Sequence, residues 1–282
     1  MPKREEIRIR DPFILTDKEK GVYYMYGTTA LENGLRAGDT FSAYVTKDLE
    51  NFEGPFEVFN GSEIGFWATF DYWAPEVHKY NGKYYLLGSM KGEGKCRATH
   101  IFVSETPLGK FRPVTQAPIT PAGWECLDGT LWVENGVPYL VFCHEWLQVG
   151  NGEIWAMPLT DDLTAPAGEK KLLFRAGDHP QVVNNREASA GGASGKVTDG
   201  PFLFEEGGKL KMIWSSFIEG GKYAVLEAVS DGGIFGKWEH KSSRYGFDGG
   251  HAMLFDGLDG VKRISLHAPN TPPNERAAFF KW

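Results

Sequence analysis

Three aspartates open similar short segments of the chain, and their side chains could do acid–base chemistry. Asp11 lies in RDPFIL, Asp128 in LDGTLWV and Asp199 in TDGPFLF, and each is followed by Pro or Gly and then an apolar run. Carboxyl groups on two sides of a scissile bond can act as general acid and general base, as the hydrolysis of glycosidic bonds requires. A third carboxyl group nearby can raise the pKa of the acid by like-charge repulsion.

Each of these aspartates also has a purely structural explanation. Asp before Pro or Gly is a common turn residue, because its side chain accepts hydrogen bonds from nearby backbone N–H groups. The catalytic explanation requires that segments far apart in the sequence meet at one place. The elements that carry the aspartates therefore decide between the two explanations.

These segments belong to a repeat of short strands. Five units run through an apolar strand, a turn, an aromatic strand and a third strand, and they begin at Asp11, Ala74, Asp128, Asp199 and Gly250. All-strand repeats of roughly 50–70 residues are typical of a β-propeller, with one four-stranded antiparallel blade per unit. We therefore predict an all-β fold, a five-bladed β-propeller, in which residues 1–282 form a single domain.

A propeller would bring the aspartates together. Its innermost strands line the axial channel, and their first residues face one mouth of that channel. We expect Asp11, Asp128 and Asp199 to hold equivalent positions at the starts of three inner strands. Ala74 and Gly250 begin the other two units, so the fold itself does not require aspartate there.

Composition excludes several classes of function. The net charge of −7 argues against a nucleic-acid partner, and no apolar run approaches the length of a membrane span. The three cysteines fit neither a disulfide framework nor a zinc site, so we expect free thiols. The N-terminus has no apolar signal-peptide core, which leaves a cytoplasmic location open beside an exported one whose leader was removed.

Five motifs together resemble a known family. RDPFI, WAPEVHKYNGKYYLLGS, LDGTLWV, DGPFLF and GGHAMLF are similar to motifs of glycoside hydrolase family 43, the five-bladed arabinofuranosidases, xylosidases and arabinanases. The resemblance covers essentially the whole chain. It implies inverting hydrolysis, with Asp11 as the base that activates water, Asp128 as the carboxylate that tunes the acid, and Asp199 as the acid.

The resemblance also implies a carbohydrate substrate. We expect exo-acting release of α-L-arabinofuranosyl or β-D-xylosyl groups from arabinan, arabinoxylan or oligosaccharides derived from these plant polysaccharides. Arabinose is the first choice because it is frequent in the family. His251 of GGHAMLF resembles the axial histidine of the family, which implies a possible structural calcium ion in the central channel, and no cofactor is required.

The acid position departs from the family pattern. The family usually has Glu where this chain has Asp199, and the shorter side chain reaches roughly 1–1.5 Å less far, which can cost on the order of 10²-fold in rate. Asp199 could be the acid with the substrate seated deeper, or Glu145 of CHEW could supply the proton. A catalytically weak site is the third interpretation, and it leads to the alternative function of an inactive carbohydrate-binding propeller.

Five further residues are candidate substrate ligands. Trp73 directly precedes an inner strand and could stack on a sugar, although most tryptophans belong to packing. Glu76 should point into the channel like Ala74, where it could bond a sugar hydroxyl or a metal-bound water, or be solvated. His144 and His267 end second strands, and Arg276 could bond a substrate hydroxyl or form a surface salt bridge.

Overall fold

Turn residues cut the chain into short antiparallel strands. Asn81-Gly82 and Asn135-Gly136 take positive φ at both positions, as two-residue hairpin turns require. Gly207-Gly208 does the same between two strands of a later hairpin. The computed structural model of the chain describes residues 1–29, 31–32, 36–187 and 191–282, and strands dominate it.

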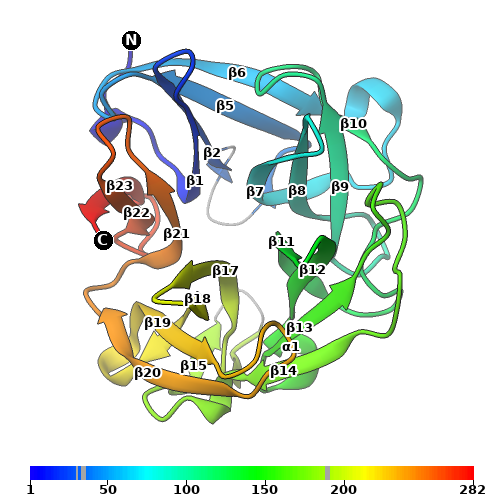
Figure 1. Cartoon of the computed structure of the whole chain (residues 1–282), viewed down its shortest axis with the longest axis vertical. Helices are drawn as coiled ribbons and strands as arrows, with labels where there is room; N and C mark the ends of the chain where they lie inside the picture. Colours follow the sequence, from blue (N-terminus) through cyan, green and yellow to red (C-terminus); the bar gives the residue numbers. More distant parts are fainter. Residues whose placement is uncertain (30, 33–35, 188–190) are drawn as a thin grey trace.

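Five antiparallel sheets are arranged as blades around a common axis (Figure 1). From the axis outward, blade 1 contains β1 (Arg10–Asp17), β2 (Val22–Thr28), β5 (Thr40–Thr46) and β6 (Phe52–Asn60). Blade 2 contains β7 (Phe70–Tyr80), β8 (Lys83–Lys91), β9 (Ala98–Ser104) and β10 (Arg112–Pro113). Blade 3 contains β11 (Cys126–Glu134), β12 (Val137–His144), β13 (Glu153–Pro158) and β14 (Lys171–Arg175).

Blade 4 contains β17 (Asp199–Glu206), β18 (Lys209–Ile218), β19 (Lys222–Ser230) and β20 (Trp238–Tyr245). Blade 5 contains β21 (Gly250–Asp256), β22 (Lys262–Ala268) and β23 (Arg276–Lys281). Two small hairpins, β3 (Leu31–Glu32) with β4 (Arg36–Ala37) and β15 (Asn185–Glu187) with β16 (Ala193–Gly195), lie outside the blades. The predicted five-bladed propeller is confirmed, but the fifth blade has three strands rather than four within the described residues.

Every inner strand carries the same irregularity near its start. The pairing with the second strand shifts after Arg10, Trp73, Leu127, Asp199 and Gly250. The residue that follows has positive φ in every blade: Asp11 54°, Ala74 44°, Asp128 54°, Gly200 50° and His251 51°. Positive φ is uncommon outside glycine, and a bulge re-aims the side chain that carries it. The five bulges therefore form a ring of specially oriented residues around the axis.

Hydrogen bonds between neighbouring blades hold these bulges. The bulge residue's backbone N–H donates to a polar side chain at the end of the previous blade's second strand. The pairs are Ala74 to Thr28 Oγ1 (2.8 Å), Asp128 to Ser89 Oγ (2.7 Å), His251 to Ser215 Oγ (2.7 Å) and Asp11 to His267 Nδ1 (3.2 Å). Between blades 3 and 4, Cys143 occupies the position on the second strand that holds the acceptor in the other blades. The Gly200 N–H donates to Asp128 Oδ2 instead (3.0 Å).

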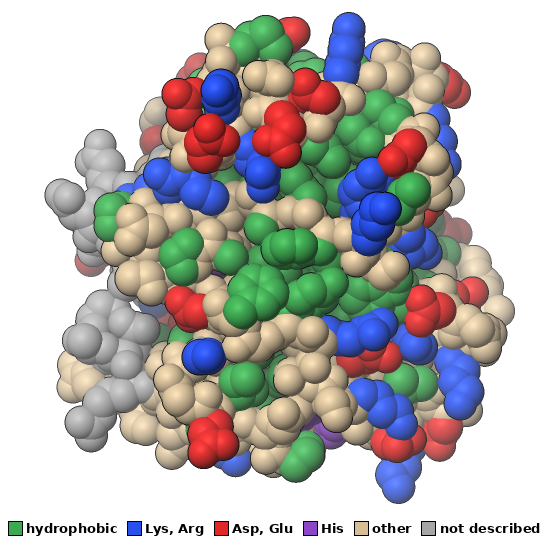
Figure 2. Space-filling view, turned by 90° about the vertical axis from the view of Figure 1, so that its left-hand side faces the viewer, with side chains coloured by type: hydrophobic (Ala, Val, Ile, Leu, Met, Phe, Trp, Pro, Cys, Tyr) green, Lys and Arg blue, Asp and Glu red, His purple; other side chains and the backbone are tan. Residues whose placement is uncertain are grey.

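Hydrophobic side chains fill the space between the blades, and β1 packs against β21 to close the ring. Because blade 5 lacks a fourth strand in the described chain, β23 lies at an edge. Phe280 on β23 and Phe247 nearby are 39% and 47% exposed, and their rings contact each other. Figure 2 shows hydrophobic side chains gathered on the side of the ring that carries blade 5.

The cysteines are free, as the sequence predicts. Cys126 and Cys143 are buried on adjacent strands of blade 3, and Cys96 is half-buried. Among the described residues, no helix is long and apolar enough to cross a membrane.

Candidate active site

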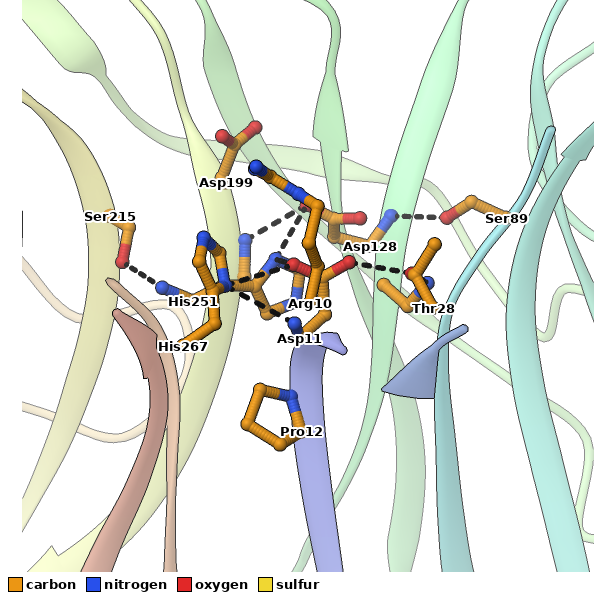
Figure 3. A network of polar contacts seen from close by, with 12 residues as sticks. Arg10, Asp11, Pro12, Thr28, Ser89, Asp128, Asp199, Ser215, His251 and His267 are labelled. Carbon is orange, nitrogen blue, oxygen red and sulfur yellow. Dashed lines mark hydrogen bonds and ion pairs between the residues drawn. The ribbon is translucent and has the colours of Figure 1, made fainter. Parts of the chain in front are cut away.

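The structure brings Asp11, Asp128 and Asp199 together near the starts of the inner strands, close to the axis of the ring (Figure 3). Their positions in the blades are not all equivalent, contrary to the prediction from the repeat. Asp11 and Asp128 are bulge residues, whereas Asp199 is the residue before the bulge, in the place that Arg10 holds in blade 1. The Asp199 carboxyl group therefore lies apart from the ring of axial side chains, above it in Figure 3.

Asp11 is held as a buried carboxylate. Its Oδ2 accepts a hydrogen bond from the Thr28 hydroxyl at 2.7 Å, and its Oδ1 lies 3.2 Å from His251 Nδ1. Burial opposes ionisation, but the charges of His251 and Arg10 outweigh it and hold the pKa of Asp11 below its usual value. A carboxylate that stays ionised can accept a proton from water, as a general base must.

Asp128 has the opposite electrostatic environment. Its Oδ2 accepts the Gly200 N–H and lies 3.7 Å from His251 Nδ1. Burial raises the pKa of Asp128 to about 7, and the charges of Asp199 and Asp11 add to this effect while His251 opposes it. Its protonation is therefore linked to that of Asp199.

Asp199 is less buried than the other two aspartates. Burial raises the pKa of Asp199 above its usual value, and the nearby charge of Asp11 adds to the effect, while His251 and a hydrogen bond from the Tyr223 hydroxyl oppose it. Carboxyl groups whose pKa values are pushed apart are the pattern of an acid and a base in one active site. Asp11 fits the base, and Asp199 fits the acid.

Glu145 lies in a different group of side chains. It follows β12, its backbone N–H donates to Glu125 O at 2.8 Å, and its Oε2 lies 3.6 Å from Arg97 Nε. Burial raises the pKa of Glu145, and the Arg97 guanidinium opposes the rise because it favours the ionised form. Glu145 is close enough to feel the charge of Asp199, so it is the alternative proton donor.

Trp73, the candidate for sugar stacking, lies near the start of β7. It precedes the bulge of blade 2, so it holds the place that Arg10 and Asp199 hold in their blades. Its ring is half-buried, and the Arg97 guanidinium carbon lies 3.6 Å from the ring centroid. The cation fixes the indole and leaves part of it exposed for stacking.

His251 lies between Asp11 and Asp128 at the axis. Its Nδ1 contacts a carboxylate oxygen of each, and the charges of Asp11 and Asp128 outweigh burial and raise the pKa of His251. Within the described residues no group of three or more His, Cys, Asp or Glu side chains is arranged to hold a metal. This donor set does not fit a calcium site built from protein atoms, because the acidic oxygens face the histidine.

The remaining predicted ligands have other partners. Glu76 is buried farther along β7, with its Oε2 2.9 Å from His78 Nε2. His144 uses Nδ1 toward Glu153 (3.1 Å) and Nε2 toward Gln148 (2.7 Å), so both its nitrogens have partners inside blade 3 and its α-helical turn α1 (Trp146–Val149).

His267 and Arg276 differ from the sequence-based expectation. His267 is 0% exposed and cannot touch substrate, because its Nδ1 accepts the Asp11 N–H and its Nε2 faces Asn270 Oδ1 at 3.0 Å. Burial lowers the pKa of His267 to about 3, so it meets Asp11 as a neutral ring. Arg276 donates to three backbone carbonyls, including Glu5 O at 2.6 Å, at the outer strand of blade 5, and among the described residues it has no salt-bridge partner.

Sequence reasoning missed several residues that build the site. Thr28, Ser89 and Ser215 each pair with the residue before the bulge, so an alignment of the repeats could have revealed them as a set. The repeat gives no such indication for Tyr223, which donates to Asp199, or for Arg97, which pairs with Glu145. Among the described residues, each of these contacts is made once and is not repeated in the other blades.

Comparison with known proteins identifies the family of the chain. The model of the glycosyl hydrolases family 43 matches residues 6–279. The structure is similar to the endo-arabinase of Bacteroides thetaiotaomicron VPI-5482, with a TM-score of 0.90 and 40% identity over 99% of this chain and 96% of that chain. An endo-1,4-β-xylanase from the same organism shares the fold, with a TM-score of 0.74 and 24% identity over 99% and 91% of the two chains.

A curated relative adds a sequence match of partial length. The extracellular exo-α-(1→5)-L-arabinofuranosidase of Streptomyces avermitilis is 26% identical over 160 residues, which is 54% of this chain and 31% of the relative. The chain thus matches less than a third of that protein's length. The family recognised from the motifs is confirmed, and with it the predicted enzyme class: the chain belongs to family 43 of the glycosyl hydrolases.

Proposed function

We propose that the protein hydrolyses α-1,5-linked arabinofuranosyl chains, in arabinan or its oligosaccharides, with inversion at the anomeric carbon. The observation that carries the proposal is the convergence of Asp11, Asp128 and Asp199 at the inner strands, with the pKa lowered at Asp11 and raised at Asp199. Arabinan is favoured because the endo-arabinase and the exo-α-(1→5)-L-arabinofuranosidase are both named for arabinose polymers.

The two aspartates divide the reaction between them. Asp11 takes a proton from water as the water oxygen attacks the anomeric carbon. The bond from that carbon to the glycosidic oxygen breaks, its electron pair stays on the oxygen, and Asp199 donates its proton there. Burial and the nearby charge of Asp11 raise the pKa of the acid, and Asp128, whose protonation is linked to that of Asp199, tunes it. Asp11 and Asp199 return to their starting states by proton exchange with solvent. No step passes through a metal.

The position of cleavage is a separate matter. The sequence-based expectation is exo action. The 40% identical relative is named an endo-arabinase and favours cleavage within the chain as a second candidate. Early products separate the two, because an exo enzyme releases one small product whereas an endo enzyme gives a mixture of oligosaccharides.

Hydrolysis of a substrate panel tests the proposal. The panel should contain debranched arabinan, xylan, an aryl arabinofuranoside and an aryl xyloside, and proton NMR should record the first-formed anomer. We expect arabinan to be the best polymer and the anomeric configuration to be inverted. Net retention contradicts the mechanism. Sugar binding without turnover on any substrate supports the inactive carbohydrate-binding propeller instead.

A further inference from the structure

Tyr223 is a buried tyrosine whose hydroxyl meets the proposed acid. It lies at the start of β19, the third strand of blade 4, and is 1% exposed. Its hydroxyl donates to Asp199 Oδ2 at 2.9 Å. Burial raises the pKa of Tyr223 well above its usual value, so the phenol keeps its proton and remains a donor.

The ring of Tyr223 is fixed on both sides. It stacks on His267 with centroids 5.6 Å apart and packs against Phe217 at 5.2 Å. Its backbone carbonyl accepts the Gly249 N–H at 3.1 Å, which ties β19 to the start of blade 5. The hydroxyl therefore has little freedom to follow a moving carboxyl group.

Gly250 makes room for this ring. A Cβ atom at Gly250 would lie 2.4 Å from Tyr223 Cε1, closer than real Cβ atoms approach a neighbour. The φ of Gly250 is not positive, so space rather than backbone conformation explains the glycine. The second glycine of the GGHAMLF motif is thus accounted for by Tyr223.

We propose that Tyr223 is the positioning residue of Asp199 and compensates for its short side chain. This proposal rests on the proposed function, in which Asp199 is the acid. Because Oδ2 accepts the phenol hydrogen bond, the proton of neutral Asp199 resides on Oδ1, for which the described residues provide no hydrogen-bond partner. The same phenol stabilises the carboxylate that forms when that proton leaves, since hydrogen bonds to ionised groups are the stronger ones.

Other titratable groups near Asp199 interact with it electrostatically, and among the described residues none of them donates a hydrogen bond to its side chain. Arg10 and Asp11 face it from β1, Asp128 from β11, Cys143 and Glu145 from β12 and its end, and His251 from β21. Among the described residues Tyr223 alone is recorded as donating a hydrogen bond to the Asp199 side chain. Its removal should therefore affect the orientation of the acid specifically.

Tyr223→Phe tests this role, because it removes the hydroxyl and keeps the ring. Tyr26→Phe is the matched control, since Tyr26 of blade 1 is equally buried and donates at 2.7 Å to Pro107 O, between β9 and β10 of blade 2. On an arabino-oligosaccharide we expect Tyr223→Phe to lower kcat about 10- to 100-fold with little change in KM. On an aryl arabinofuranoside with a good leaving group the loss should be much smaller, because little protonation is needed.

The same change in an Asp199→Asn background separates the possible failures. If Tyr223 acts through Asp199, Tyr223→Phe adds little further loss there. A Tyr223→Phe variant that matches Tyr26→Phe on both substrates, or that adds its full effect to Asp199→Asn, overturns the proposal. If Asp199→Asn itself loses equally on both substrates, the assignment of the acid fails instead.

Gly250→Ala gives a second route if Tyr223→Phe folds poorly, as judged by its Tm. The added methyl group pushes the Tyr223 ring from its place without altering the phenol. A loss confined to the oligosaccharide supports the positioning role, and an equal loss on both substrates contradicts it.

Discussion

Replacing Asp128 with Asn is expected to stabilise the fold above neutral pH and to change it little in acid. Asp128 is 6% exposed, and burial raises its pKa from 3.8 to about 7. In the unfolded chain the carboxyl group ionises near pH 4. Between these values the folded protein binds more protons than the unfolded chain, so the wild type loses stability as the pH rises from about 4 to about 7.

The size of the effect follows from the gap between the two pKa values. A gap of about three units corresponds to at most about 4 kcal/mol of unfolding free energy. Asn can still accept the Gly200 N–H, but it gives up the attraction of a carboxylate to His251. We therefore expect the variant to be more stable by about 1–3 kcal/mol above pH 8 and nearly unchanged near pH 4.

Urea unfolding at pH 4.5 and pH 8.5 measures this difference. Asp11→Asn is the matched control, because the charges of His251 and Arg10 outweigh burial and lower the pKa of Asp11. Ionised Asp11 therefore stabilises the fold above pH 4, and its replacement should destabilise the protein at pH 8.5. A stability gain of Asp128→Asn that is the same at both pH values, or a loss at pH 8.5, would refute the electrostatic account of Asp128.

Three further outcomes are expected. kcat/KM should fall as the pH rises through the raised pKa of Asp199 and that of the linked Asp128, the latter at about 7. Activity should persist to below pH 4 because the pKa of Asp11 is lowered. Initial rates from pH 3 to 9 check this, and a rise above pH 8 contradicts it. Trp73→Ala should raise KM about tenfold through lost sugar stacking, whereas Trp124→Ala, whose ring faces His144 and a lysine, should not. Dialysis against EDTA should leave kcat and Tm unchanged, and a loss that calcium restores would reveal an ion in the channel.

The repeat predicted the blades correctly but placed Asp199 one residue off. DGT in blade 3 and DGP in blade 4 look alike, yet the bulge falls on Asp128 in one and on Gly200 in the other. The prolines indicate the correct alignment of the units, because Pro12, Pro75 and Pro201 each directly follow the bulge residue. Aligning the units on proline would have shown Asp199 in the place of Arg10.

The two histidines show a second limit of the sequence. His144 and His267 both end second strands, and the sequence suggests the same role for both. In the pairing register, Cys143 rather than His144 is equivalent to His267, because it pairs with the residue before the bulge. Adjacent residues of a strand point to opposite faces. His267 therefore reaches the Asp11 N–H, whereas His144 meets Glu153.

The identity of the acid is the central claim, and one comparison tests it most directly. Asp199→Asn and Glu145→Gln should each be assayed on an arabino-oligosaccharide and on an aryl arabinofuranoside with a good leaving group. We expect Asp199→Asn to lose on the order of 10²–10⁴-fold on the oligosaccharide and far less on the aryl glycoside, while Glu145→Gln loses similarly and modestly on both. The reverse pattern would contradict the account and make Glu145 the acid.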